Sequence, residues 1–262
     1  MSTTLITSND PKGRQLMSVV AAVYDKAELT DEAAQLLNER GDEFKAGLRG
    51  LIARLSTKAP DYSVAREILG NDFVSPEEIA TARRGVVYNP KQLLELGNTV
   101  PSKDVLEWCR DNGFMVVAGP SRPTSLLDIR ELERSHFYTK EGGWYANDSE
   151  TFARNDKATC RWLILRKEPV PGSTNKTWNE QEKLLSEVEV VPNAAEMVWG
   201  MTAYKAVRGV YLLSSVYVRT SSVGSFGDRV GVGLFGEGGL GVHCWYDRDR
   251  YDLLGVSSSR KS

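Results

Sequence analysis

Residues 227–261 decide which fold we expect, and they run GDRVGVGLFGEGGLGVHCWYDRDRYDLLGVSSSRK. Three segments of this tail, residues 229–235, 240–246 and 254–258, alternate apolar residues with turn-forming residues and are predicted to be β-strands. Side chains alternate between the two faces of a strand, so one set should face the core. The framework residues expected to point inward are Val230, Val232, Phe235, Leu240, Val242, Leu254 and Val256.

The composition of the tail favours recognition over stability. Residues 224–241 contain eight glycines and lead into a run of aromatic, histidine and arginine side chains over residues 243–251. A glycine inside a strand loses packing and costs backbone entropy, so stability alone does not favour this segment. Rings, guanidinium groups and small residues on neighbouring strands are typical of binding surfaces.

Upstream of the tail, helices come first and strands later. We expect helices over residues 31–55, 62–69, 76–82, 90–96, 102–112, 177–187 and 193–207, and strands over 114–118, 162–165 and 216–220. This order predicts an α+β fold rather than a parallel βαβ sheet. We expect a mainly helical N-terminal region over residues 1–100 and a second domain over residues 101–262.

Composition narrows the class of protein. The 262 residues are 41% hydrophobic and 26% charged, an ordinary globular balance that argues against a disordered or fibrous chain. The formal net charge of −2 lacks the basic excess of proteins that coat nucleic acid, so we expect no nucleic-acid partner. Apolar runs are too short for a transmembrane helix, and the start lacks the features of a signal peptide.

Cysteine and histidine usage bears on compartment and cofactors. The three cysteines, Cys109, Cys160 and Cys244, are widely spaced and form neither a disulfide framework nor a Cys-x-x-Cys motif. A reducing cytoplasm is therefore the expected location. With only two histidines, His136 and His243, a histidine-rich metal centre is not expected, and we predict no metal and no cofactor.

Residues 231–236 match the G-x-G-x-x-G pattern of dinucleotide-binding proteins. That fingerprint requires a helix after the glycines, because the N–H groups at the helix N-terminus hold the pyrophosphate. Here a turn and another strand follow. We therefore reject a nucleotide site.

The segment 246–252 places three carboxylates within six residues, at Asp247, Asp249 and Asp252. Clustered oxygens suit calcium, but the EF-hand pattern is absent and Arg248 and Arg250 neutralise the acids locally. A solvated charged loop is the interpretation we adopt.

The adjacent pair His243 and Cys244 suggests a nucleophile with its base. Neighbours on a strand point to opposite faces, so these side chains are not expected to meet. The pair is therefore not assigned a catalytic role.

The tail resembles the variable region of target proteins of diversity-generating retroelements. Residues 62–69, 126–130, 165–174 and 216–222 are also similar to such proteins, so the likeness covers most of residues 60–262. The resemblance implies a C-type-lectin-like fold of the formylglycine-generating-enzyme type, with a variable region at about residues 228–256. It also implies a function: a reverse transcriptase copies a template repeat with mutations at adenines, and the copy diversifies a ligand-binding surface.

The family pattern implies which positions vary and bind ligand. They are Gly231, Leu234, Gly236, Gly241, His243, Cys244, Arg248, Asp249, Tyr251 and Leu253. Each of these residue types is an accessible outcome of an AAC codon whose two adenines are randomised. Trp245 is a further candidate that this codon cannot produce, so it is either a fixed scaffold residue or the product of another template codon.

Three functions follow as alternatives. The first is a non-catalytic binding protein for an unidentified ligand, a protein or another cell-surface molecule. The second is an attachment or structural component of a phage or mobile element, displayed on a virion or cell surface through a partner. The third is an enzyme like the formylglycine-generating enzymes, which use a cysteine pair and a metal. The N-terminal helices are either an adaptor to partner proteins or a structural extension.

Overall fold

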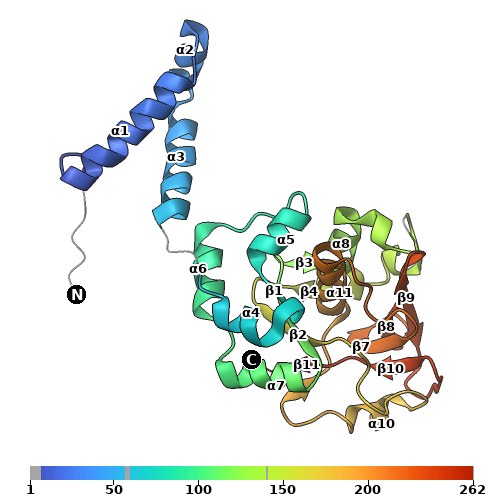
Figure 1. The fold of residues 1–262 in the computed structure, drawn as a ribbon. Coiled ribbons are helices and arrows are strands. Elements are labelled where there is room, and N and C mark those ends of the chain that lie inside the picture. The colour runs from blue at the N-terminus through green and yellow to red at the C-terminus, as the bar shows by residue number, and fades with distance from the viewer. Residues whose placement is uncertain (1–6, 57–59, 140, 262) are drawn as a thin grey trace. The chain divides into compact units, whose positions relative to one another are not determined.

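The computed structural model describes residues 7–56, 60–139 and 141–261, which fall into two compact units divided after residue 56 (Figure 1). The division differs from the boundary expected at residue 100. Helices between residues 63 and 98 belong to the second unit, because their apolar side chains, including Leu69, Ile79 and Leu96, are part of its core.

The first unit consists of α1 (Pro11–Lys26), α2 (Asp31–Glu39) and α3 (Gly41–Ser56). The single helix expected over residues 31–55 is thus two helices. The backbone leaves the helical region at Arg40, with φ −94° and ψ 27°, directly before Gly41, a residue that weakens a helix.

The second unit begins with four helices that match their predicted ranges within two residues. These are α4 (Ser63–Leu69), α5 (Pro76–Ala82), α6 (Pro90–Asn98) and α7 (Lys103–Asp111). Ser75 and Asn89 form capping boxes at the starts of α5 and α6, each followed by proline. These local signals fix the helix starts without tertiary help.

Three sheets follow, in a mixed α and β unit. The first has the order β1-β2-β5-β11-β6 and the second the order β10-β7-β8-β9, while β3 pairs only with β4. The strands are β1 (Phe73–Val74), β2 (Phe114–Ala118), β3 (Thr124–Ser125), β4 (Lys157–Ala158), β5 (Trp162–Arg166), β6 (Glu189–Val190), β7 (Tyr217–Val223), β8 (Arg229–Gly236), β9 (Gly239–Trp245), β10 (Leu254–Val256) and β11 (Ser259–Arg260). Of their pairings, β1 with β2 and β10 with β7 are parallel.

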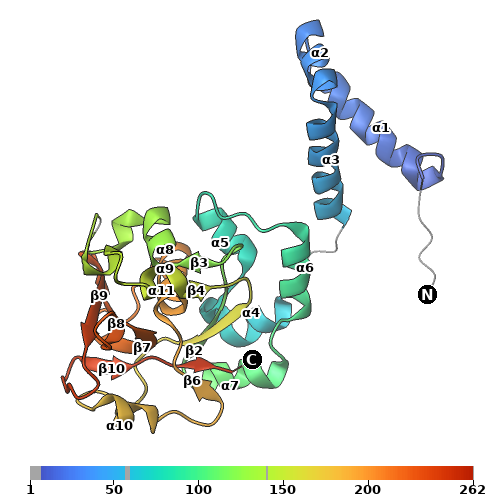
Figure 2. The same ribbon diagram turned by 180° about the vertical axis from the view of Figure 1, so that it is seen from behind.

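Helix α11 (Ala194–Arg208) packs against strands of both larger sheets (Figures 1 and 2). Residues 194–204 of this helix are all buried except Glu196, which is only slightly exposed. This is expected for a helix that is apolar on most of its surface. Its Trp199 donates to the carbonyl of Ala118 in β2 at 2.9 Å. The core is therefore centred on α11.

The remaining helices are short: α8 (Leu126–Leu132), α9 (Phe152–Asn155) and α10 (Trp178–Glu182), with 3-10 turns at Gly70–Asp72, Arg134–His136 and Trp144–Ala146. The predicted helix over residues 177–187 ends five residues early. Beyond it, Leu185 and Val191 pack on a small cluster of Val170, Trp178 and Val256, which draws the chain into the edge strand β6.

The strand expected over residues 254–258 is confirmed only for 254–256, which pair with β7 as β10. Ser257 and Ser258 then connect β10 to β11 of the first sheet. The Ser257 hydroxyl donates to the carbonyl of Arg219 at 2.7 Å, and that of Ser258 donates to Glu189 at 2.6 Å. The end of the tail thus joins both sheets. Among the described residues, no helix is long and apolar enough to span a bilayer.

Candidate ligand-binding face

The strand register assigns the tail residues to two faces of the second sheet. Gly231 and Gly233 of β8 lie opposite His243 and Gly241 of β9. Directly opposed residues of antiparallel strands point to the same side, so these four share one face. The same register adds Tyr217 and Arg219 of β7 to it. We call this side of the sheet, together with the loop 246–253 and Leu234, the tail face.

The other side of the sheet faces α11 and is apolar. Val218, Val230 and Val232 are fully buried there, and Val242 is half-buried against the same core. Phe235, Leu240, Leu254 and Val256 are also buried. Burial is confirmed for six of the seven framework residues, with Val242 partly covered. Leu254 and Val256, however, pair with Tyr217 and Arg219 and so lie on the side of the sheet away from α11.

Cys244 lies on the inner side, opposite Val230 and not on the tail face. Its partial burial, together with a hydrogen bond and the negative charge of Asp228, raises the pKa of its thiol to about 12. A protonated thiol is a poor nucleophile. His243, on the opposite face, is exposed. The two side chains thus point apart, as the alternation rule predicts.

Glycines form a floor for an aromatic cluster on the tail face. A Cβ atom at Gly231 would lie 2.6 Å from a ring carbon of Trp245, and one at Gly241 would lie 2.2 Å from the Tyr217 hydroxyl. The Tyr217 and Trp245 ring centroids are 4.9 Å apart, and His243 stacks on Trp245 at 4.7 Å. The glycines leave the space that these rings occupy beside the backbone, and the rings together make an aromatic patch.

The glycines of β8 and β9 differ in how firmly they are required. A Cβ at Gly233 would lie 2.1 Å from the carbonyl oxygen of Val216, a backbone atom, whereas nothing lies within 4 Å of a Cβ at Gly236. Substitution at Gly231 or Gly241 would displace a ring instead. Among the predicted variable glycines, therefore, Gly236 has the most room for side chains.

Leu234 lies at an irregularity in the β8–β9 pairing, between Gly233 and Gly236. Its φ of +43° is in the left-handed region, which costs an ordinary residue about 1–2 kcal/mol. Its side chain is 40% exposed. Backbone strain of this kind is concentrated at binding sites and active sites.

A buried arginine holds the loop of the tail face. Arg219 of β7 is fully buried, and its guanidinium donates to the carbonyls of Tyr246 and Asp249 at 2.9 and 3.0 Å. It also donates to the Gln181 side chain of α10 at 3.0 Å. Charged hydrogen bonds of this kind are stronger than neutral ones. Arg219 therefore ties the loop to both β7 and α10.

In the loop 246–253, some side chains are exposed to solvent and others form hydrogen bonds within the loop. Tyr251 and Leu253 are 53% and 59% exposed, and Arg248 is exposed beside the Tyr246 ring. Asp249 instead accepts a 2.9 Å hydrogen bond from the backbone N–H of Tyr246, which closes the turn. Asp249 thus contributes to the loop conformation rather than to display.

Ion pairs join the loop to neighbouring segments. Arg229 contacts Asp247 at 3.2 Å and covers the Trp178 ring, and Arg250 contacts Glu180 at 2.9 Å. Hydrogen bonds from Thr177, followed by the one from Arg250, lower the pKa of Glu180 to about 2. These exposed pairs are worth little individually, but they fix the orientation of the loop.

The structure brings together Gly231, Gly241, His243 and Trp245 on the sheet, and Leu234, Arg248, Tyr251 and Leu253 as exposed neighbours. Sequence reasoning missed Tyr217 and Arg219, which complete the face. Alternation along the predicted strand 216–220 could have placed both on one side. What it could not supply was the register that aligns them with the tail.

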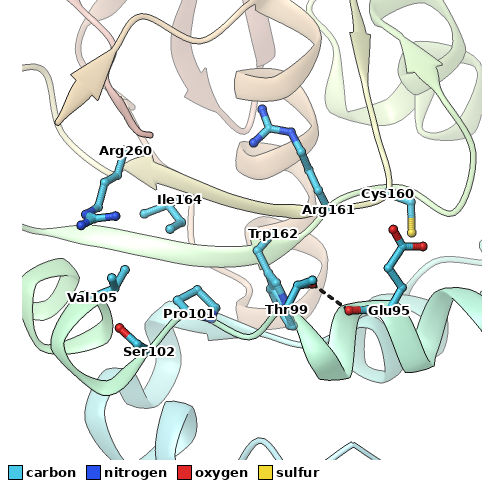
Figure 3. Close-up of a pocket in the computed structure, with 10 residues that line it drawn as sticks. All are labelled: Glu95, Thr99, Pro101, Ser102, Val105, Cys160, Arg161, Trp162, Ile164 and Arg260. Atoms are coloured by element: carbon cyan, nitrogen blue, oxygen red, sulfur yellow. Dashed lines mark hydrogen bonds between the residues drawn. The ribbon is translucent and has the colours of Figure 1, made fainter. Parts of the chain in front are cut away.

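A pocket of about 390 Å³ lies elsewhere, between the α6–α7 connection and strands β5 and β11 (Figure 3). Trp162 and Ile164 form part of its apolar wall, with Arg260 at one end and Glu95 beside Cys160 at the other (Figure 3). Burial and the charge of Glu95 raise the pKa of the Cys160 thiol. None of the predicted variable residues lines this pocket.

Within the described ranges, no three histidine, cysteine, aspartate or glutamate side chains are arranged to hold a metal ion. Comparisons of the chain with protein-family models, with curated proteins and with solved structures found no match.

Proposed function

We propose that this protein is a non-catalytic ligand-binding protein whose tail face is diversified by a retroelement. In this proposal the second unit is a C-type-lectin-like scaffold of the formylglycine-generating-enzyme type. The ligand is an unidentified protein or cell-surface molecule. The tail's likeness to retroelement target proteins suggests the diversification, and the geometry of the tail face supports a binding role.

One observation carries the binding role: the tail presents side chains outward while buried residues hold its backbone. Leu234, His243, Arg248, Tyr251 and Leu253 are all exposed. Beneath them, the valines facing α11 and the guanidinium of Arg219 hold the strands and the loop. A surface of this kind can change its side chains without rebuilding the core, which is how antibody loops vary.

The chemistry of the tail face suits a macromolecular ligand. Tyrosine, tryptophan and arginine are the residue types that dominate binding energy at protein interfaces. Here Tyr217, Trp245 and Tyr251 lie on or beside the face, with Arg248 on the loop. Rigid aromatic side chains lose little conformational entropy on binding.

The cysteines favour binding over catalysis. The pKa of the Cys109 thiol and that of the Cys244 thiol are both raised to about 12, chiefly by burial, and that of Cys160 is also raised. A catalytic cysteine requires the opposite shift, because the thiolate is the reactive form. This supports the binding protein over a cysteine-dependent enzyme.

The test is a display library of the full chain, randomised at Leu234, His243, Arg248, Tyr251 and Leu253. A matched control library is randomised at five exposed positions elsewhere in the second unit, Arg84, Lys91, Asn98, Lys103 and Asp111. Both libraries are selected against a panel of unrelated proteins. We expect folded clones from both and enriched binders from the first. Loss of folding in the first library, or equal enrichment from the control, would overturn the proposal.

A further inference from the structure

Within the first unit, the described helices leave several apolar side chains uncovered. Leu16, Val19 and Val23 of α1 recur at helical spacing on one side and are 50%, 56% and 66% exposed. In α3, Phe44 is 51% exposed. Among the described side chains of residues 7–48, Gly13 is the only buried residue.

Such helices need a partner to be stable. Isolated helices of about 12–15 residues are marginal in water, and most helical stability comes from packing an apolar side. In Figures 1 and 2, α1 and α3 diverge from the end at which α2 joins them, so their apolar sides do not cover each other. The cover must come from another surface.

The distribution of charged residues in the first unit indicates which surface covers these apolar side chains. Helix α1 is basic, with Lys12, Arg14 and Lys26 against the single acid Asp25. Residues 28–43, which span α2 and the start of α3, contain six acidic residues and only one basic residue, Arg40. The remainder of α3 is basic, with Lys45, Arg49 and Arg54, so the segment complementary in charge to α1 is residues 28–43. A second copy of the chain offers α1 this acidic segment.

We propose that two copies of this chain associate through their first units, with α1 of each copy packed on α2 and the first turn of α3 of the other. A twofold arrangement satisfies both apolar sides and both charged segments at once. Such a dimer would present two tail faces and increase avidity. The association of the first units does not depend on which ligand the tail face binds.

The first test is the mass of the full-length protein by light scattering across the micromolar range. We expect twice the chain mass of 29.1 kDa. Replacing Leu16→Asp and Val23→Asp together should give a monomer. The matched control carries Ser18→Asp and Ala21→Asp, which add the same two negative charges at exposed positions of α1 outside the Leu16, Val19 and Val23 stripe, and it should leave the dimer intact. A monomeric wild-type protein would overturn the proposal.

The second test separates pairing between copies from pairing within one chain. One variant carries Lys12→Glu and Lys26→Glu, which makes α1 acidic. Another carries Glu28→Lys, Glu32→Lys and Glu39→Lys, which makes residues 28–43 basic. Each alone should dissociate at least about tenfold more readily, a change of about 1.4 kcal/mol. Mixed together they should form a heterodimer, because both contacts then join opposite charges. Failure to associate on mixing, or an unchanged dimer in either variant alone, would overturn the proposal.

Discussion

At the scale of single residues, Leu234 combines an exposed side chain with a strained backbone conformation. Its left-handed backbone suits glycine, yet the chain carries a large apolar side chain there and exposes 40% of it. A residue retained for stability would not be of this type. A position that varies by copying errors need only be tolerated, and Leu is one product of a randomised AAC codon.

The strain at Leu234 predicts a contrast between two substitutions. Leu234→Gly should unfold at an equal or higher denaturant concentration than the wild type, because glycine adopts this conformation freely. Leu234→Ile should lower the free energy of unfolding by about 1–2 kcal/mol relative to Leu234→Gly, because β-branched residues are least compatible with positive φ. Urea denaturation of the full chain measures both. Equal stability of the two variants would show that the strain is absent.

Arg219 is the residue on which the tail face depends. Its guanidinium donates to carbonyls at both ends of the turn 246–249, and burial lowers its pKa. The residue lies outside the tail, so the loop is held by a part of the chain that the resemblance does not make variable.

Replacing Arg219→Met should cost about 2–4 kcal/mol of unfolding free energy, because several buried acceptors lose their donor. The matched control is Arg248→Met, which removes an exposed arginine from the same loop and should cost less than about 0.5 kcal/mol. Chemical denaturation compares the two. Similar losses from both variants would mean that Arg219 does not anchor the loop.

At the scale of elements, strand β8 combines fixed and free positions. Val230 and Val232 pack under the sheet, Gly233 lies against the backbone of Val216, and Gly236 has open space around it. Strand β8 thus contains positions that the fold requires and positions that can accept other side chains. Its edge neighbour β9 is itself covered, because Trp144 donates to the Val242 carbonyl at 2.9 Å.

The two glycines of β8 should respond differently to the same change. Gly233→Ala places a methyl group against a carbonyl oxygen and should lower the free energy of unfolding by at least about 2 kcal/mol. Gly236→Ala adds the same group where nothing lies within 4 Å, and it should be neutral within about 0.5 kcal/mol. Thermal unfolding of both variants checks this. A neutral Gly233→Ala would show that the close approach is relieved in solution.

Local signals explain which elements were predictable. The start of α5 follows from Ser75, Pro76 and Glu78, which are adjacent in sequence, and strand 114–118 from an uninterrupted apolar run. The predicted helix over residues 31–55 is interrupted at Arg40, directly before Gly41, which is a local break that the sequence itself could have indicated. The predicted helix over 177–187 ends at Glu182, and beyond it Leu185 packs on a cluster built from distant segments, a tertiary contact that local preference does not show.

At the scale of the whole molecule, the site was less predictable than the fold class. Spacing alone identified the inward valines, but the pairing of Cys244 with Val230 and of His243 with Gly231 depends on register. Register depends on contacts between distant segments, including Arg219 and the loop it holds. The division after residue 56 was missed for the same reason, since the packing of α4 to α6 on the core is tertiary.

The central claim is that the tail varies on one face of a constant scaffold. It is tested most directly by deep sequencing the 3′ end of this gene across a population of its source organism, together with the flanking DNA. We predict that substitutions gather at the codons of Leu234, His243, Arg248, Tyr251 and Leu253, while Val230, Val232 and Gly233 stay fixed. A near-repeat of this segment should lie beside a reverse transcriptase gene. A uniform tail without such a repeat, or substitutions spread equally over inward and outward positions, would contradict the claim.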